Sequence, residues 1–107
     1  MPEQAVIVDF TYGSQDLSKL FELEDRLVRA ISDAGVGEYD GNEISTDGSD
    51  ATLYMYGQDA DCLFEAVRPI LEATASMVGA KVRKRYGPPK DGIRETQTTI
   101  ASQFDRG

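Results

Sequence analysis

Histidine and tryptophan are absent from the 107 residues, and cysteine occurs once, as Cys62. Without histidine the chain lacks the commonest general base, the usual zinc ligand and the central member of serine-type triads. A single cysteine can form neither an internal disulfide nor a metal cluster, and a lone thiol is typical of a reducing compartment. The sequence therefore indicates no metal, no cofactor and no common catalytic group.

Two further absences bear on where the protein works. The N-terminal residues include Glu3 and lack the basic start and the apolar stretch of a signal peptide. No apolar run approaches the ~18 residues that are needed to cross a bilayer. We therefore expect a cytoplasmic protein that does not contact a membrane.

Basic residues are scarce relative to acidic ones. The chain holds 11 Lys and Arg against 19 Asp and Glu, for a formal net charge of -8. Such a charge repels nucleic acid and anionic membranes and suits a basic protein partner, although many cytosolic proteins are as acidic without one. We expect the partner to be a protein or a second copy of the chain, and not a nucleic acid.

Apolar residues at helical spacing predict two helices. The first begins after a cap at Ser14 or Asp16 and ends at Ala34, before Gly35. The second begins at a cap at Asp59 or Asp61, runs to about residue 76 and continues past Pro69. Their expected inward faces are Leu17, Leu20, Phe21, Leu27, Val28 and Ile31 for the first, and Leu63, Val67, Ile70, Leu71 and Thr74 for the second.

Strands are predicted over residues 5–11, 41–46, 51–57, 81–86 and 93–100, the last as an edge strand. The second and third form a hairpin around Asp47-Gly48, with Ile44 opposite Leu53 and Glu43 opposite Tyr54. Residues 93–100 either pair with the sheet or cover its open face.

The order of elements predicts an α+β fold, a ferredoxin-like βαββαβ sandwich with an extra C-terminal edge strand. Both crossovers are right-handed, so two helices cover one face of an antiparallel sheet in the order 4-1-3-2. Residues 1–100 form one domain and residues 101–107 a flexible tail. The expected core is Val8, Phe10, Leu20, Phe21, Val28, Ile31, Leu53, Met55, Val67 and Leu71.

This topology leaves one sheet face without helices, and that face is the candidate interaction surface. Its predicted members are Ile7, Asp9, Glu43, Tyr54, Tyr56, Arg83 and Arg85. We expect a non-catalytic interaction module that can form a homodimer, since tyrosine is enriched at protein interfaces. The alternative is a small enzyme or ligand binder that uses the carboxylates and tyrosines of this face. Cross-strand pairing of Asp9 with Arg83 or Arg85 would explain the same residues structurally.

Two smaller features are weighed as sites. Asp40, Asn42 and Glu43 belong to a candidate acidic loop, but its spacing fails the calcium-loop pattern and matches turn chemistry. Cys62 lies in the first turn of the second helix, where the dipole lowers a thiol pKa while Asp59 and Asp61 raise it. We expect Cys62 to be partly buried and structural.

Three segments, GVGEYDGNEI, ATLYMYGQDADCLFEAVRPIL and KVRKRYGPP, carry GxGxxDGNE, YxYGxDAD and RYGPP patterns. In these the chain resembles a group of small bacterial cytosolic proteins whose function is unknown. The likeness covers residues 35–89. It implies a bacterial cytosolic protein and draws attention to one set of residues: Gly35, Gly37, Asp40, Gly41, Asn42 and Glu43.

Overall fold

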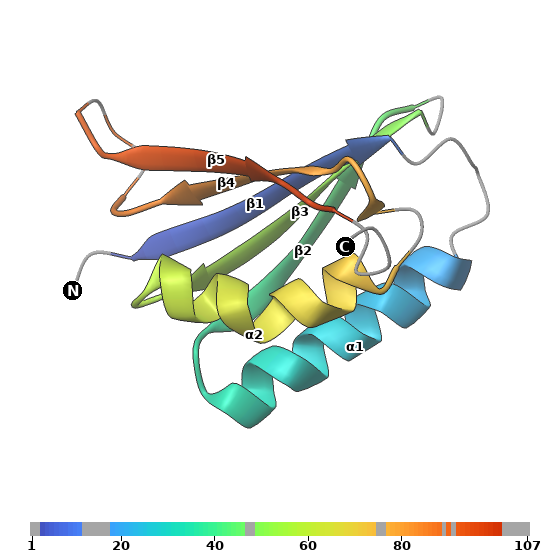
Figure 1. Ribbon diagram of the computed structural model, residues 1–107, viewed down its shortest axis with the longest axis horizontal. Helices are drawn as coiled ribbons and strands as arrows, with labels where there is room; N and C mark the ends of the chain where they lie inside the picture. The colour runs from blue at the N-terminus through green and yellow to red at the C-terminus, as the bar shows by residue number, and fades with distance from the viewer. Residues whose placement is uncertain are drawn as a thin grey trace.

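The computed structural model describes residues 3–11, 18–46, 49–74, 77–88, 90 and 92–101. Two helices pack on a five-stranded antiparallel sheet, so the α+β architecture is confirmed (Figure 1). The elements are β1 (Gln4–Thr11), α1 (Ser18–Ala34), β2 (Glu38–Ile44), β3 (Asp50–Gly57), α2 (Ala60–Glu72), β4 (Lys81–Arg85) and β5 (Glu95–Thr99). The predicted caps Ser14 and Asp16, and the predicted tail from residue 102 onward, lie outside the described residues.

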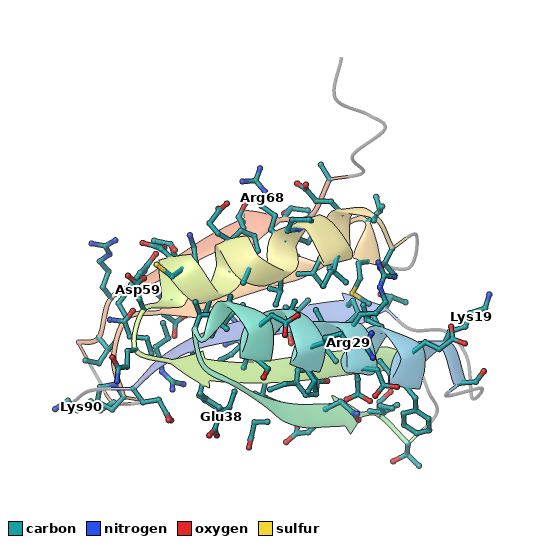
Figure 2. All side chains as sticks on the ribbon, turned by 90° about the horizontal axis from the view of Figure 1, so that it is seen from below. Lys19, Arg29, Glu38, Asp59, Arg68 and Lys90 are labelled. Atoms are coloured by element: carbon teal, nitrogen blue, oxygen red, sulfur yellow. The ribbon has the colours of Figure 1, made fainter. Side chains whose placement is uncertain are left out.

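The strand order is β2-β3-β1-β4-β5, with every neighbouring pair antiparallel. Both helices lie on the same side of this sheet, with α2 toward β4 and β5 and α1 toward β2 (Figures 1 and 2). Of the two expectations for residues 93–100, edge pairing is the one observed, because β5 pairs with β4. Ile100 continues that pairing by donating its backbone N–H to Ala80 at 2.9 Å.

The core fills the space between the helices and one face of the sheet. Alternate residues of the central strands point into it, as the period of two requires. The core residues are Val6, Val8, Phe10, Leu20, Leu23, Leu27, Ile31, Ala51, Leu53, Met55, Ala60, Leu63, Phe64, Val67, Leu71, Met77, Ala80, Val82 and Ile100. Eight of the ten predicted core residues are therefore confirmed.

The two wrong core predictions are both on α1. Phe21 is 53% exposed and Val28 is 48% exposed, whereas Leu23 is buried and was missed. A stripe that includes Phe21 and Val28 and a stripe that includes Leu23 both satisfy helical spacing. They differ only in the direction in which the apolar stripe is read around the helix. Leu17 lies outside the described residues.

The hairpin is displaced from its predicted register by two residues. Ile44 lies opposite Ala51, and Asn42 lies opposite Leu53. The turn closes one residue earlier because the Ser45 hydroxyl accepts a hydrogen bond from the Asp50 backbone N–H at 3.0 Å. A two-residue displacement keeps every side chain on its predicted face.

Helix ends follow the predicted chemistry where they are described. Gly35 ends α1 in a left-handed conformation, with φ of 65°. Asp59 is the N-cap of α2, accepting backbone hydrogen bonds from Asp61 and Cys62. Pro69 lies inside α2, which continues to Glu72 and so ends earlier than predicted.

Candidate functional site on the helix-free sheet face

The sheet register places all seven predicted surface residues on the face without helices. Three rows cross this face at similar heights along the strands. From β2 to β5, the rows are Glu38, Tyr56, Ala5, Arg85 and Glu95; then Gly41, Tyr54, Ile7, Arg83 and Gln97; then Glu43, Thr52, Asp9, Lys81 and Thr99. Reading down the strands, β2 is acidic, β3 carries the two tyrosines and β4 is basic.

Part of this face is buried although no helix covers it. Ala5 is fully buried and Ile7 is only 7% exposed, yet neither belongs to the core cluster. Ile7 pairs with Tyr54 on one side and Arg83 on the other, and side chains of that length shield a shorter neighbour. The expectation that Ile7 is an exposed contact residue is thus corrected: Ile7 lies beneath the surface layer.

The predicted cross-strand pair forms with Arg83. Its Nε lies 3.4 Å from Asp9 Oδ2, close enough for an ion pair. That Nε is nevertheless buried without a hydrogen bond, so the attraction is electrostatic and lacks hydrogen-bond geometry. The other oxygen of Asp9 accepts a hydrogen bond from the Thr52 hydroxyl at 2.8 Å. Asp9 is therefore held by two neighbouring strands.

Tyr54 and Glu43 are neighbours on the same face. Partial desolvation, followed by the negative charge of Glu43, raises the pKa of Tyr54. A raised pKa keeps the phenol protonated at neutral pH, which is the opposite of what a tyrosine general base needs. The hollow of about 390 Å³ beside Asp9 is lined by Thr52 and Lys81 but by neither Tyr54 nor Tyr56. The carboxylates and tyrosines of the face thus do not converge on that hollow.

The candidate acidic loop is a strand, and its members are separated. Asp40 lies at a register irregularity between Tyr39 and Gly41. Glu43 points to the helix-free face, and Asn42 points to the helix side, where its amide donates to Glu24 Oε2 at 2.8 Å. These three side chains therefore do not form one site.

Glu24 of α1 is the centre of a contact that the sequence reasoning missed. Its Oε2 accepts hydrogen bonds from both Asn42 and the Tyr39 hydroxyl. Burial, and then the hydrogen bond to Glu24, strongly raise the pKa of Tyr39. The sequence held one signal for this contact: Glu24 lies between apolar positions, at the edge of the apolar stripe of α1. This cluster attaches α1 to the edge strand β2.

A second missed cluster joins α2 to β4. Asp61 Oδ1 accepts hydrogen bonds from the Tyr86 hydroxyl at 2.7 Å and from Lys84 Nζ at 2.9 Å. These hydrogen bonds, that of Tyr86 foremost, lower the pKa of Asp61. The guanidinium carbon of Arg94 lies 4.4 Å from the centre of the Tyr86 ring. This contact extends the cluster to the loop before β5. Asp61 is one of the two predicted caps of the second helix, but its carboxylate accepts hydrogen bonds from Lys84 on β4 and from Tyr86, the residue after β4.

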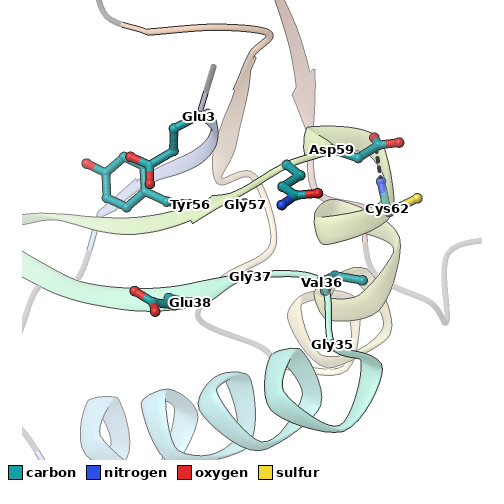
Figure 3. A pocket seen from close by; sticks show the side chains of 10 residues that line it. Glu3, Gly35, Val36, Gly37, Glu38, Tyr56, Gly57, Asp59 and Cys62 are labelled. Atoms are coloured by element: carbon teal, nitrogen blue, oxygen red, sulfur yellow. Dashed lines mark hydrogen bonds between the residues drawn. The ribbon is translucent and has the colours of Figure 1, made fainter. Parts of the chain in front are cut away.

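Two of the quoted sequence segments meet at a shallow cavity of about 740 Å³ (Figure 3). Gly37 and Gly57 approach so closely that a Cβ on Gly37 would lie 2.1 Å from the Tyr56 carbonyl oxygen. Cys62 lines this cavity and is exposed, so its predicted partial burial is wrong. The hydrogen bond and charge of Asp59 raise the pKa of the Cys62 thiol, which makes it a weaker nucleophile at neutral pH. Close backbone packing therefore explains Gly37 and Gly57.

Comparison with protein-family models, curated proteins and solved structures finds no match to this chain. In the described residues, no group of three or more Asp, Glu and Cys side chains could hold a metal ion. None of the described helices is long and apolar enough to cross a membrane.

Proposed function

We propose that this protein is a self-associating interaction module whose helix-free sheet face binds the same face of a second copy. We further propose that the fold is ferredoxin-like, with which the observed order of strands and helices is compatible. The bacterial and cytoplasmic setting that the resemblance implies belongs to the same proposal.

The observation that carries this proposal is the order of charge across the face. We call Glu38 and Glu43 on β2 the acidic band, and Lys81, Arg83 and Arg85 on β4 the basic band. Both acids are exposed, and the two bands lie three strands apart. A two-fold axis that runs parallel to the strands, between β3 and β1, exchanges the two sides of the sheet. It brings the acidic band of each copy over the basic band of the other, which favours association.

The same axis matches the rows residue by residue. Glu38 meets Arg85 of the partner copy, and Glu43 meets Lys81 of the partner copy. Between these charged rims, the β3 tyrosines lie over β1: Tyr56 over the small Ala5, and Tyr54 over Ile7. Tyrosine and arginine around a desolvated centre are the residue types that contribute most to binding at interfaces.

The alternative two-fold axis, perpendicular to the strands, places each band over the same band of the partner copy. Acidic β2 would then face acidic β2, and basic β4 would face basic β4, which costs free energy. The charge order therefore favours the first of these two face-to-face arrangements.

The face offers a contact of moderate size. The four strands that overlap in this arrangement, β2, β3, β1 and β4, hold 28 residues, and at about 4.8 Å between strands and 3.3 Å per residue they cover a footprint of roughly 450 Å². Side chains make the buried accessible area larger than this footprint, and a standard interface buries ~800 Å² per partner. Ala5 and Ile7 already supply a desolvated floor.

Charge reversal tests this proposal directly. One variant carries Lys81→Glu and Arg85→Glu, so both of its bands are acidic. The other carries Glu38→Lys and Glu43→Lys, so both are basic. We expect each alone to dimerise roughly tenfold or more weakly than the wild type in sedimentation equilibrium, and an equimolar mixture to form a one-to-one dimer.

The matched control is Arg26→Glu with Arg29→Glu, which makes the same change in net charge on the exposed side of α1. It should leave the dimer intact. Tyr54→Ala with Tyr56→Ala should weaken the dimer without changing the far-UV circular dichroism spectrum. A wild type that stays monomeric at every concentration, or a mixture that stays monomeric, would contradict the proposal.

A further inference from the structure

One flank of α1 carries exposed apolar side chains. Phe21, at 53%, and Val28, at 48%, are two of the three large hydrophobic residues exposed in the described part of the chain. They lie seven residues apart, so they occupy the same stripe of the helix, with Glu24 between them. An apolar stripe on a surface helix is normally turned toward a partner.

The contacts of Glu24 show which way this stripe faces. Because Glu24 bonds to Tyr39 and Asn42, its flank of α1 is turned toward β2 and away from α2. From the helix side, β2 lies along the outer margin of the molecule, beyond α1 (Figure 2). Phe21 and Val28 therefore lie beside the free margin of the sheet.

β2 is an edge strand, and no other strand of the described residues pairs with its outer side. Its helix-facing Ile44 and Tyr39 are only partly buried. An unpaired strand edge beside an apolar helix flank is the arrangement that binds extended peptides by strand addition. Main-chain hydrogen bonds to the edge provide affinity, and alternate side chains of the peptide lie on the two faces of the enlarged sheet.

The charge of β2 identifies the occupant. The strand carries Glu38, Asp40 and Glu43 and no basic residue. A second copy of β2 would bring three more acids to the same edge and be repelled. A basic segment is attracted instead, and the net charge of -8 steers it toward the protein.

We infer that the outer edge of β2, beside the exposed flank of α1, binds an extended basic segment of another protein as an added strand. The segment pairs with residues 41–44, beyond the irregularity at Tyr39 and Gly41. Its alternate side chains divide between two environments. One set is apolar and contacts Phe21 and Val28, and the other is basic and lies near Glu43. The preferred sequence thus alternates basic and apolar residues.

The test measures binding of a short, fluorescently labelled peptide in which Lys alternates with Val, by fluorescence anisotropy. Wild type should bind it saturably and should not bind the peptide in which Glu replaces Lys. The same measurement on the Lys81→Glu, Arg85→Glu variant should also show binding, since β2 and α1 are unchanged there. This arm separates binding at the β2 edge from self-association through the sheet face.

Phe21→Ser with Val28→Ser should weaken binding roughly tenfold or more, because the apolar contacts are lost. The control is Val78→Ser, which removes a valine of similar exposure, 46%, next to Gly79, whose N–H bonds to Ile100 at the opposite side of the sheet from β2; it should leave the affinity within about twofold. All three side chains are about half exposed, so only small changes in melting temperature are expected.

Strand addition is tested separately by N-methylation of the peptide. Methylation of the amides that face β2 should abolish binding, and methylation of the opposite edge should not. Amides of residues 41–44 should exchange more slowly with deuterium in the complex. The inference is overturned if wild type fails to bind, if Phe21→Ser with Val28→Ser binds as wild type does, or if both methylated peptides bind equally.

Discussion

The two faces of the sheet bury the same strands by different means. On β1, Val6, Val8 and Phe10 are covered by helices, whereas Ala5 and Ile7 on the other face are covered by longer side chains of the adjacent strands. Helices give one face a closed apolar layer. The other keeps a thin apolar floor under tyrosines and charges, and that upper layer remains able to contact another molecule. Burial alone therefore does not identify the core face of a sheet.

The largest expected effect tests the helix-covered face. Leu71 is fully buried on α2, so Leu71→Ala should lower the free energy of unfolding by about 2–5 kcal/mol. Phe21, which helical spacing assigned to the same core, is 53% exposed, so Phe21→Ala should cost less than about 1 kcal/mol. Chemical denaturation measures both. Equal losses would mean that the burial of α1 is assigned wrongly.

An intermediate effect is expected at the floor of the helix-free face. Ile7→Ala should cost about 1–2 kcal/mol, less than a core deletion, because Tyr54 and Arg83 can move into the space. The dimer should weaken with it, since Tyr54 loses its support. A loss as large as that of Leu71→Ala would show that this face is packed as tightly as the core. A loss near zero would show that Ile7 is not packed at all.

An effect no larger than that of Ile7→Ala is expected at the contact at the margin between the faces. Tyr39→Phe removes the hydrogen bond to Glu24 and should cost about 1–2 kcal/mol at neutral pH. Because the folded-state pKa of Tyr39 is raised, this contribution is fully present below the unfolded pKa of about 10 and is lost as pH rises above it.

The measurement is denaturant unfolding of wild type and Tyr39→Phe from neutral pH to about pH 11, above the ordinary tyrosine pKa. The difference between the two proteins should shrink above pH 10. Tyr56→Phe, a tyrosine of the opposite face, serves as the control. A difference that is constant with pH would mean that the Tyr39 hydroxyl does not ionise differently in the folded state.

Local patterns in the sequence were sufficient for much of the fold and for the membership of the candidate surface. Period-two alternation in β1 and β3 assigned Ile7 and Tyr54 to one face and Val8 and Leu53 to the other, as observed. Even the hairpin, displaced by two residues, kept this assignment, since only an odd displacement exchanges the faces. These features depend on neighbours in the chain, which a sequence displays directly.

The failures are at positions where a distant residue decides the outcome. Nothing in the spacing of α1 distinguishes Leu23 from Phe21 as the inward residue; the packing of α1 between α2 and β2 does. The partner of Glu24 is on β2, and the partners of Asp61 are on β4 and beside it. A side chain's choice between a cap and a long-range bond depends on what the fold brings near it.

The sequence by itself determined the element types, the antiparallel order and the side of the sheet to which each strand residue points, because backbone periodicity and turn chemistry are local. Only the tertiary structure decided that Ile7 lies beneath a surface layer and that Phe21 and Val28 border an open strand edge. Those properties arise from which strands and helices become neighbours, and neighbourhood across the sheet is set by chain topology and packing rather than by any short segment.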